Sequence, residues 1–159
     1  MKVFYQLLKS SLIAAILFTC VIIESNAQSN WEAGLRFGNP NVAIDATIPI
    51  GAAPRLHPAI YISDVFAIGT YFDWLFGLTE GPQGLKFYPG VGPEFIFSSN
   101  FEVRIAGNFG VEYAFDFPLT VAFDWRPGFF ITSNFAWTSN NIGVTARFRF
   151  AEGVKFKRE

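Results

Sequence analysis

The sequence has very few of the side chains from which catalytic and metal sites are usually built. It contains one cysteine, one methionine and one histidine in 159 residues. Neither a disulfide framework nor a zinc site with several Cys and His ligands can be assembled from these. The formal net charge of −1 is far from the basic balance of a nucleic-acid-binding protein. The composition therefore predicts no cofactor, no metal and no nucleic-acid partner.

The N-terminus has the pattern of a cleaved secretory signal peptide. Lys2 and Lys9 form a positively charged segment before an apolar run from Leu12 to Ile23. Small residues, Ser25-Asn26-Ala27, follow this run. The run is shorter than the roughly 20 residues of a membrane-spanning helix. We predict cleavage after Ala27, which gives a signal peptide (1–27), a main body (28–150) and a short charged C-terminal tail (151–159).

A lipoprotein signal ending at Cys20 is the alternative interpretation of this segment. The residue before a lipidated cysteine is normally small, whereas Thr19 stands here. If Cys20 is removed with the signal, the mature chain has no cysteine and no disulfide can stabilise it.

Hydrophobic residues, 51% of the chain, are spread over alternate positions after Gln28 instead of gathering in one long run. Between Phe101 and Phe115, the odd positions are mostly large and apolar and the even positions are charged, polar or small. Successive side chains of a strand point to opposite faces, so this pattern predicts a strand with one apolar face. The same alternation predicts eight strands: 31–37, 42–48, 55–63, 66–78, 84–98, 101–115, 118–132 and 136–150. In the fifth, Pro89 and Pro93 lack the N–H of a closed ladder and indicate bulges or a break.

All charges in these strands fall on the polar face. The acids are Glu32, Asp45, Asp73, Glu94, Glu102, Glu112, Asp116 and Asp124, and the bases are Arg36, Arg55, Lys86, Arg104, Arg126, Arg147 and Arg149. A slip of one residue in any strand would place its charges among the apolar side chains, so the register is strongly specified.

Two all-β architectures have one apolar face. A soluble, lipocalin-like barrel would turn this face inward and could bind a lipophilic ligand, whereas an outer-membrane barrel would turn it outward. The charged face has six Arg and one Lys, interleaved with Gly and Ala. Arg suits enclosed ion pairs, and small residues help large ones fit inside a narrow barrel. We therefore expect an eight-stranded antiparallel transmembrane up-and-down β-barrel, closed because lipid leaves no partner for an open strand edge.

Four segments resemble the small eight-stranded outer-membrane barrels of the OmpX and OmpA-transmembrane-domain type from double-membraned bacteria. They are Gly34-Leu35-Arg36-Phe37-Gly38, Gly110-Val111-Glu112-Tyr113 with Phe117-Pro118-Leu119, Phe123-Asp124-Trp125-Arg126-Pro127, and Ala146-Arg147-Phe148-Arg149-Phe150. The resemblance covers about residues 31–150 and implies a monomer in the bacterial outer membrane. Its implied partners are outer-membrane lipids and, during biogenesis, periplasmic chaperones and the barrel-assembly machinery. The family usually ends on an aromatic residue, whereas nine residues follow Phe150 here.

Two sets of candidate site residues follow. The first comprises lumen ion-pair candidates, either a ladder that stabilises the interior or a path for ions: Arg36, Asp45, Arg104, Glu112, Asp124, Arg126, Arg147 and Arg149. The second comprises aromatic residues suited to the two membrane interfaces or to general hydrophobic contact: Trp31, Trp74, Tyr113, Trp125 and Trp137.

His57 raises the possibility of a lipid-modifying enzyme, because some outer-membrane barrels use His in catalysis. No Ser-His-Asp arrangement can be identified around it. We expect no enzymatic activity and a structural or surface-interaction role, with a lumen that eight strands leave just wide enough for side chains.

Overall fold

The computed structural model describes residues 31–39, 41–62, 65–78, 81–132 and 135–150. The predicted signal peptide and C-terminal tail lie outside these residues. No helix among the described residues is long and apolar enough to cross a membrane.

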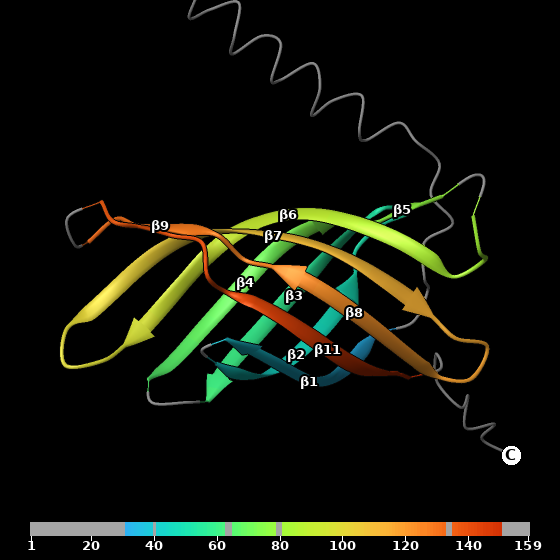
Figure 1. The fold of residues 1–159 in the computed structure, drawn as a ribbon, viewed down its shortest axis with the longest axis horizontal. Helices are drawn as coiled ribbons and strands as arrows, with labels where there is room; N and C mark the ends of the chain where they lie inside the picture. Colours follow the sequence, from blue (N-terminus) through green and yellow to red (C-terminus); the bar gives the residue numbers. More distant parts are fainter. Residues whose placement is uncertain (1–30, 40, 63–64, 79–80, 133–134, 151–159) are drawn as a thin grey trace, which may run out of the picture.

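Eleven strand segments form one antiparallel sheet that closes on itself (Figure 1). They are β1 (Glu32–Asn39), β2 (Val42–Pro49), β3 (Pro54–Ile62), β4 (Phe66–Trp74), β5 (Phe76–Gly77), β6 (Leu85–Phe97), β7 (Phe101–Ala114), β8 (Leu119–Trp125), β9 (Gly128–Phe130), β10 (Trp137–Thr138) and β11 (Ile142–Arg149). β5 continues β4, β9 continues β8, and β11 continues β10. The prediction of an eight-stranded antiparallel barrel is therefore confirmed.

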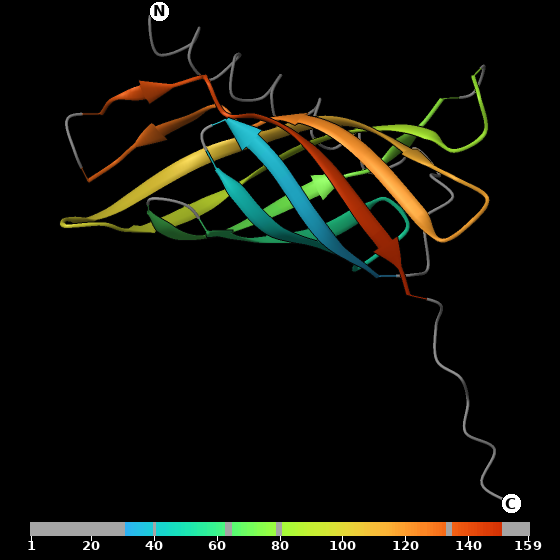
Figure 2. The ribbon, with the colours of Figure 1, turned by 60° about the horizontal axis from the view of Figure 1, so that its bottom comes forward.

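Closure joins the first strand to the last. Figure 2 shows β1 beside β11, and their register runs from Glu32 opposite Arg149 to Asn39 opposite Ile142. Beside the Glu32–Arg149 pair, the Trp31 ring stacks on the Phe150 ring with their centroids 4.7 Å apart, and the Phe150 N–H donates to the Trp31 carbonyl at 3.0 Å. The two ends of the barrel chain thus meet at one rim, which we call the near rim. The opposite rim, where β9 and β10 form a hairpin, is the far rim.

Three of the eight predicted strands are interrupted. The fourth breaks at Leu75, which is buried. Phe76 is also buried, but it stays on the apolar face, where its ring stacks on that of Phe87, its partner in β6. The seventh breaks after Trp125 and the eighth before Ile142. Asp116, expected at a strand edge on the polar face, is exposed in the turn between β7 and β8. The alternation of side chains does not reveal these interruptions, because it continues across most of them.

Prolines remove ladder bonds on one side only. β6 pairs with β7 without a gap over 13 residues, including Pro89 and Pro93. On its other side, the pairing of β6 with β4 and β5 skips the positions opposite both prolines. Pro58 in β3 likewise lies opposite a gap in the pairing with β2. Proline has no N–H to give to the ladder, so each of these residues costs a bond with one neighbouring strand and leaves the other ladder intact.

The apolar face points outward and the charged face inward. Leu35, Ile44, Ile60, Phe109 and Phe123 are between 38% and 56% exposed on the outside. Inside, the fully buried side chains are mainly charged or polar, and the buried apolar residues are mostly alanine and tyrosine. The interior is thus a polar core inside an apolar wall.

Gly92 lies where the backbones of β4 and β6 come close together. An ideal Cβ on Gly92 would lie 1.9 Å from the carbonyl oxygen of Thr70, whereas one on Gly77 would have no atom within 4 Å. Gly92→Ala must push two strands apart, so we expect a loss of about 1–3 kcal/mol in the free energy of unfolding. Gly77→Ala, the matched control, should change it by less than about 0.5 kcal/mol. Urea unfolding of the detergent-refolded barrel, followed by tryptophan fluorescence, measures both, and equal losses would contradict the close approach.

Candidate functional site

The polar interior is one connected set of ion pairs and hydrogen bonds. Among the described residues, the buried carboxylates are Glu32, Asp45, Asp73, Glu94, Glu112 and Asp124, and the buried guanidinium groups are Arg36, Arg55, Arg104, Arg126 and Arg147. These groups come from strands all around the barrel, because every second residue of each strand points inward. We call this set, together with His57, Tyr61, Tyr71 and Asn108, the interior network.

Arg147 anchors the interior network toward the near rim. Its Nε donates to Glu32 at 2.9 Å, Nη1 to Asp45 at 3.2 Å and Nη2 to Glu112 at 2.7 Å. Glu112 also lies 2.9 Å from Nη1 of Arg55. One guanidinium thus joins carboxylates from β1, β2 and β7, which uses the fork of donors that only Arg supplies.

Asp45 and Asp73 enclose His57 in the middle of the barrel. The His57 Nε2 lies 2.8 Å from Asp45 Oδ1, and the Nδ1 lies 2.6 Å from Asp73 Oδ2. Only an imidazolium has an N–H at both ring nitrogens to donate to two carboxylates. With His57 charged, six buried carboxylates face six buried cations. The ring is fully buried, and its two nitrogens are occupied by the interior network.

Arg126 spans the lumen on the far side of His57. From the link between β8 and β9, it donates to Asp45 on β2 at 2.7 Å, to the Tyr61 hydroxyl on β3 at 2.9 Å and to Asn108 on β7 at 3.1 Å. It is fully buried. A side chain that reaches three other strands closes the cross-section of the barrel at this level.

Arg36 and Asp124 form a bidentate pair. The Arg36 Nε donates to Oδ1 and Oδ2 of Asp124 at 2.8 and 3.1 Å, the Nη2 donates to Oδ1 at 2.6 Å, and both side chains are fully buried. Ideal Cβ atoms on Gly38 and Gly143 would lie 2.3 and 2.5 Å from atoms of the same guanidinium. These two glycines therefore provide the space that Arg36 fills.

The sequence-derived ion-pair candidates divide into two groups. Seven of them, all except Arg149, are buried and paired with side chains of the interior network. Within the network, Arg104 pairs with Glu94, and Glu112 pairs with Arg55 and Arg147. Arg149 is only half-buried and donates to the carbonyl groups of Phe115 and Phe117 in the near-rim turn.

Several members of the interior network were not among those candidates. They are Glu32, Arg55, His57, Tyr61, Tyr71, Asp73, Glu94 and Asn108. Each stands at an inward position of its strand, so the alternation that placed the others inside also identifies these. Their partners, by contrast, depend on which strands face one another across the lumen, and the sequence carries no direct signal of this.

The five aromatic candidates divide between the two rims. Trp31, Trp74 and Tyr113 stand at strand ends near the near rim, and Trp125 and Trp137 lie toward the far rim. Trp137 packs against Phe129 with ring centroids 4.4 Å apart, and the Trp125 Nε1 donates to the Ser139 carbonyl at 2.7 Å.

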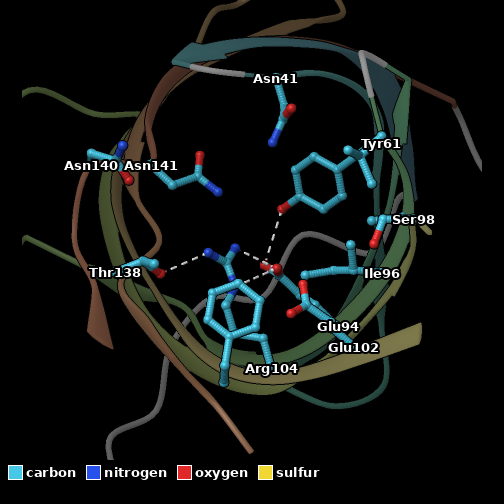
Figure 3. Close-up of a pocket in the computed structure, with 13 residues that line it drawn as sticks. Asn41, Tyr61, Glu94, Ile96, Ser98, Glu102, Arg104, Thr138, Asn140 and Asn141 are labelled. Carbon is cyan, nitrogen blue, oxygen red and sulfur yellow. Dashed lines mark hydrogen bonds and ion pairs between the residues drawn. The ribbon is translucent and has the colours of Figure 1, made fainter. Parts of the chain in front are cut away.

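A cavity of about 390 Å³ lies at the far rim (Figure 3). Tyr61, Glu94 and Arg104 contribute to its lining from the interior network, and Asn41, Thr138 and Asn141 from the rim. Arg104 donates to Glu94 through Nε at 2.7 Å and to the Thr138 hydroxyl at 2.9 Å. Within the ranges that the structure describes, no group of three or more His, Cys, Asp or Glu side chains is placed to hold a metal ion.

Comparisons of the chain with protein-family models, with curated proteins and with solved structures found no match.

The Arg36–Asp124 pair can be tested by removing one or both charges. Asp124→Ala leaves the Arg36 guanidinium buried without its carboxylate, and we expect a loss of about 3–5 kcal/mol in the free energy of unfolding. The double variant Arg36→Met/Asp124→Leu removes both charges and should cost clearly less than the sum of the single changes Arg36→Met and Asp124→Leu. Urea unfolding in detergent measures the wild type and the four variants. Additive losses would show that the two side chains do not stabilise the barrel as a pair.

Proposed function

We propose that the chain is an integral outer-membrane β-barrel protein of a double-membraned bacterium, with a closed lumen and a structural or surface-interaction role. One observation supports this most directly: large apolar side chains cover the outside of the barrel, and charges fill the inside. A soluble monomer rarely exposes a contiguous apolar surface larger than a few hundred Å². In a bilayer, the same surface contacts hydrocarbon, and the closed sheet leaves no strand edge unpaired.

The aromatic candidates at both rims fit this setting. Trp and Tyr are enriched where a membrane protein passes from hydrocarbon to headgroups. Trp31 and Trp74 lie toward one rim and Trp137 toward the other, so a membrane between the rims would have such residues at both of its surfaces. The N-terminal signal pattern supports export, and the resemblance to small outer-membrane barrels favours a monomer that contacts outer-membrane lipids. During biogenesis, periplasmic chaperones and the barrel-assembly machinery would be its partners.

The soluble alternative needs its phenylalanines inside the barrel. The structure places Phe95, Phe109 and Phe123 outside, with 40% to 56% of each side chain exposed. Next to them, the lumen holds the charged and polar side chains of the interior network. The observed orientation thus favours the membrane setting.

A non-enzymatic role agrees with the surroundings of His57. A general base must come within hydrogen-bond reach of the proton that it removes. Both His57 nitrogens already face carboxylates, and the ring has no exposed surface. We propose that His57 balances charge in the interior network.

A charge on the outer wall tests the membrane placement. Val111 lies on β7 and is 48% exposed, so Val111→Arg would place a guanidinium in hydrocarbon at a cost of up to about 2–4 kcal/mol. Gln83→Arg adds the same charge in an exposed turn and serves as the matched control. We expect the full chain, expressed in a double-membraned bacterium, to fractionate with the outer membrane and to show heat-modifiable gel mobility. Val111→Arg should reduce both, and Gln83→Arg should reduce neither. Wild-type protein that stays soluble without detergent would contradict the proposal.

A closed lumen predicts that the inserted barrel does not conduct ions. Arg126 spans the cross-section through its bonds to Asp45, Tyr61 and Asn108, and it is fully buried. Planar-bilayer recordings of the purified protein should show no current steps beyond those of a protein-free detergent control. Protease protection of the same sample in vesicles verifies insertion. Discrete steps that scale with the amount of inserted protein would contradict a closed lumen.

A further inference from the structure

The far-rim cavity contains a buried amide that has no hydrogen-bond partner among the described residues. Asn141 is 2% exposed, and neither its Oδ1 nor its Nδ2 has a hydrogen-bond partner in the part of the chain that the structure describes. Figure 3 shows this amide pointing into the cavity, with the Asn41 side chain pointing into the same space. An unsatisfied buried polar group costs about 1–3 kcal/mol, so a ligand that supplies both a donor and an acceptor would gain from this residue.

A bulge aims Asn141 at the cavity. Thr138 pairs with Gly128, and the Arg126 N–H donates to the Asn141 carbonyl at 2.8 Å. One residue, Pro127, thus lies between these positions on the β8–β9 side, whereas two, Ser139 and Asn140, lie between them on the β10–β11 side. The additional residue reverses the alternation, so Thr138 and Asn141 both face the cavity and Ile142 faces outward. Bulges are a known means of re-aiming a side chain beside a functional site.

The charged residues of the cavity are already engaged. Glu94 accepts from Arg104 and from the hydroxyls of Tyr61 and Tyr71, and Arg104 also binds Thr138. Glu102, which lines the same cavity, has an interaction as well. Ligand recognition is thus left to groups that both donate and accept, which favours an uncharged ligand.

Apolar side chains complete the wall. Ala67, Ile96 and Phe130 line the cavity together with the amides and hydroxyls, and the Arg104 guanidinium lies 5.8 Å from the centre of the Phe130 ring. A sugar ring presents hydroxyls at its edge and C–H groups on its faces, and so matches a cavity with both kinds of surface. The volume of about 390 Å³ lies at the small end of ligand sites, which suits one or two rings.

We propose that the far-rim cavity binds an uncharged mono- or disaccharide, with the Asn141 amide donating to one ligand hydroxyl and accepting from another. This inference goes beyond the membrane placement, because the cavity belongs to the barrel in any surroundings.

The test uses the full chain refolded in a detergent without a sugar headgroup. Saturation-transfer NMR and calorimetry are run with methyl α-glucoside, methyl α-galactoside, N-acetylglucosamine, maltose and trehalose, and with glucosamine and glucuronate as charged comparators. We expect at least one neutral sugar to bind saturably and more tightly than both charged comparators. Absence of saturable binding by every neutral sugar at millimolar concentrations, or tighter binding of a charged comparator, would overturn the proposal.

Variants assign the binding to the cavity. Asn141→Leu keeps the size of the side chain but removes the amide, so affinity should fall at least tenfold. Asn41→Ala, on another part of the cavity wall, should weaken the same sugar. Asn39→Leu changes an exposed asparagine of the same rim that does not line the cavity, and it should leave affinity unchanged. If Asn141→Leu and Asn41→Ala both bind like the wild type, the sugar binds elsewhere and the proposal fails.

Stability provides a readout that a structural asparagine would not give. Asn141→Leu deletes an unsatisfied buried amide, so without sugar the variant should resist urea at least as well as the wild type. A large loss of stability would show that the amide is satisfied within the protein and would overturn the proposal. Because binding is measured on the isolated barrel, a negative result leaves the membrane proposal intact, and failed fractionation leaves this one intact.

Discussion

The central constraint on this structure is that a ring of eight strands turns every second side chain into a space only wide enough for side chains. The residues that fill this space are mainly charged, so each must find an opposite charge without water. Arg147 and Arg126 meet this requirement by each joining several strands. Removing water from a charge is costly, and only good geometry compensates for it. The interior network therefore ties the strands to one another through the lumen, in addition to the backbone ladders of the wall.

The narrow interior also explains where small residues and prolines stand. The side chain of Arg36 occupies space that Cβ atoms on Gly38 and Gly143 would fill, so large inward residues depend on small neighbours. The prolines of β3 and β6 each leave a gap toward one adjacent strand, and the ladder on the other side continues. A closed sheet tolerates such gaps because each strand has two neighbours. Prolines are unusual within strands, but the closed barrel accommodates them because each strand keeps a continuous ladder of hydrogen bonds with its second neighbour.

Side-chain alternation was enough to predict the number of strands and the separation of charged from apolar faces. It depends only on the local geometry of a strand, so Asp45, Arg104 and Asp124 could be placed on one face before the fold was known. The charge partners could not be predicted in the same way. Arg104 pairs with Glu94, and Glu112 pairs with Arg55 and Arg147, because pairing depends on the depth of each residue along the barrel. Depth follows from the stagger of strands around the ring, to which residues distant in the sequence contribute.

The far rim shows why the departures from alternation carry the most specific information. The strand break between Thr138 and Ile142 was not predicted, because one inserted residue in a polar segment leaves almost no trace in the pattern of hydrophobicity. That residue nevertheless decides whether Asn141 faces the lumen or the outside. Between the far-rim cavity and the near rim, carboxylates and guanidinium groups pair with one another and fill the lumen. At the rim the network ends on Arg104 and Thr138, and the amide turned inward by the bulge has no partner among the described residues. The same network that fills the lumen therefore ends at this cavity through Tyr61, Glu94 and Arg104, and the proposed ligand would supply the partner that the amide of Asn141 lacks among the described residues.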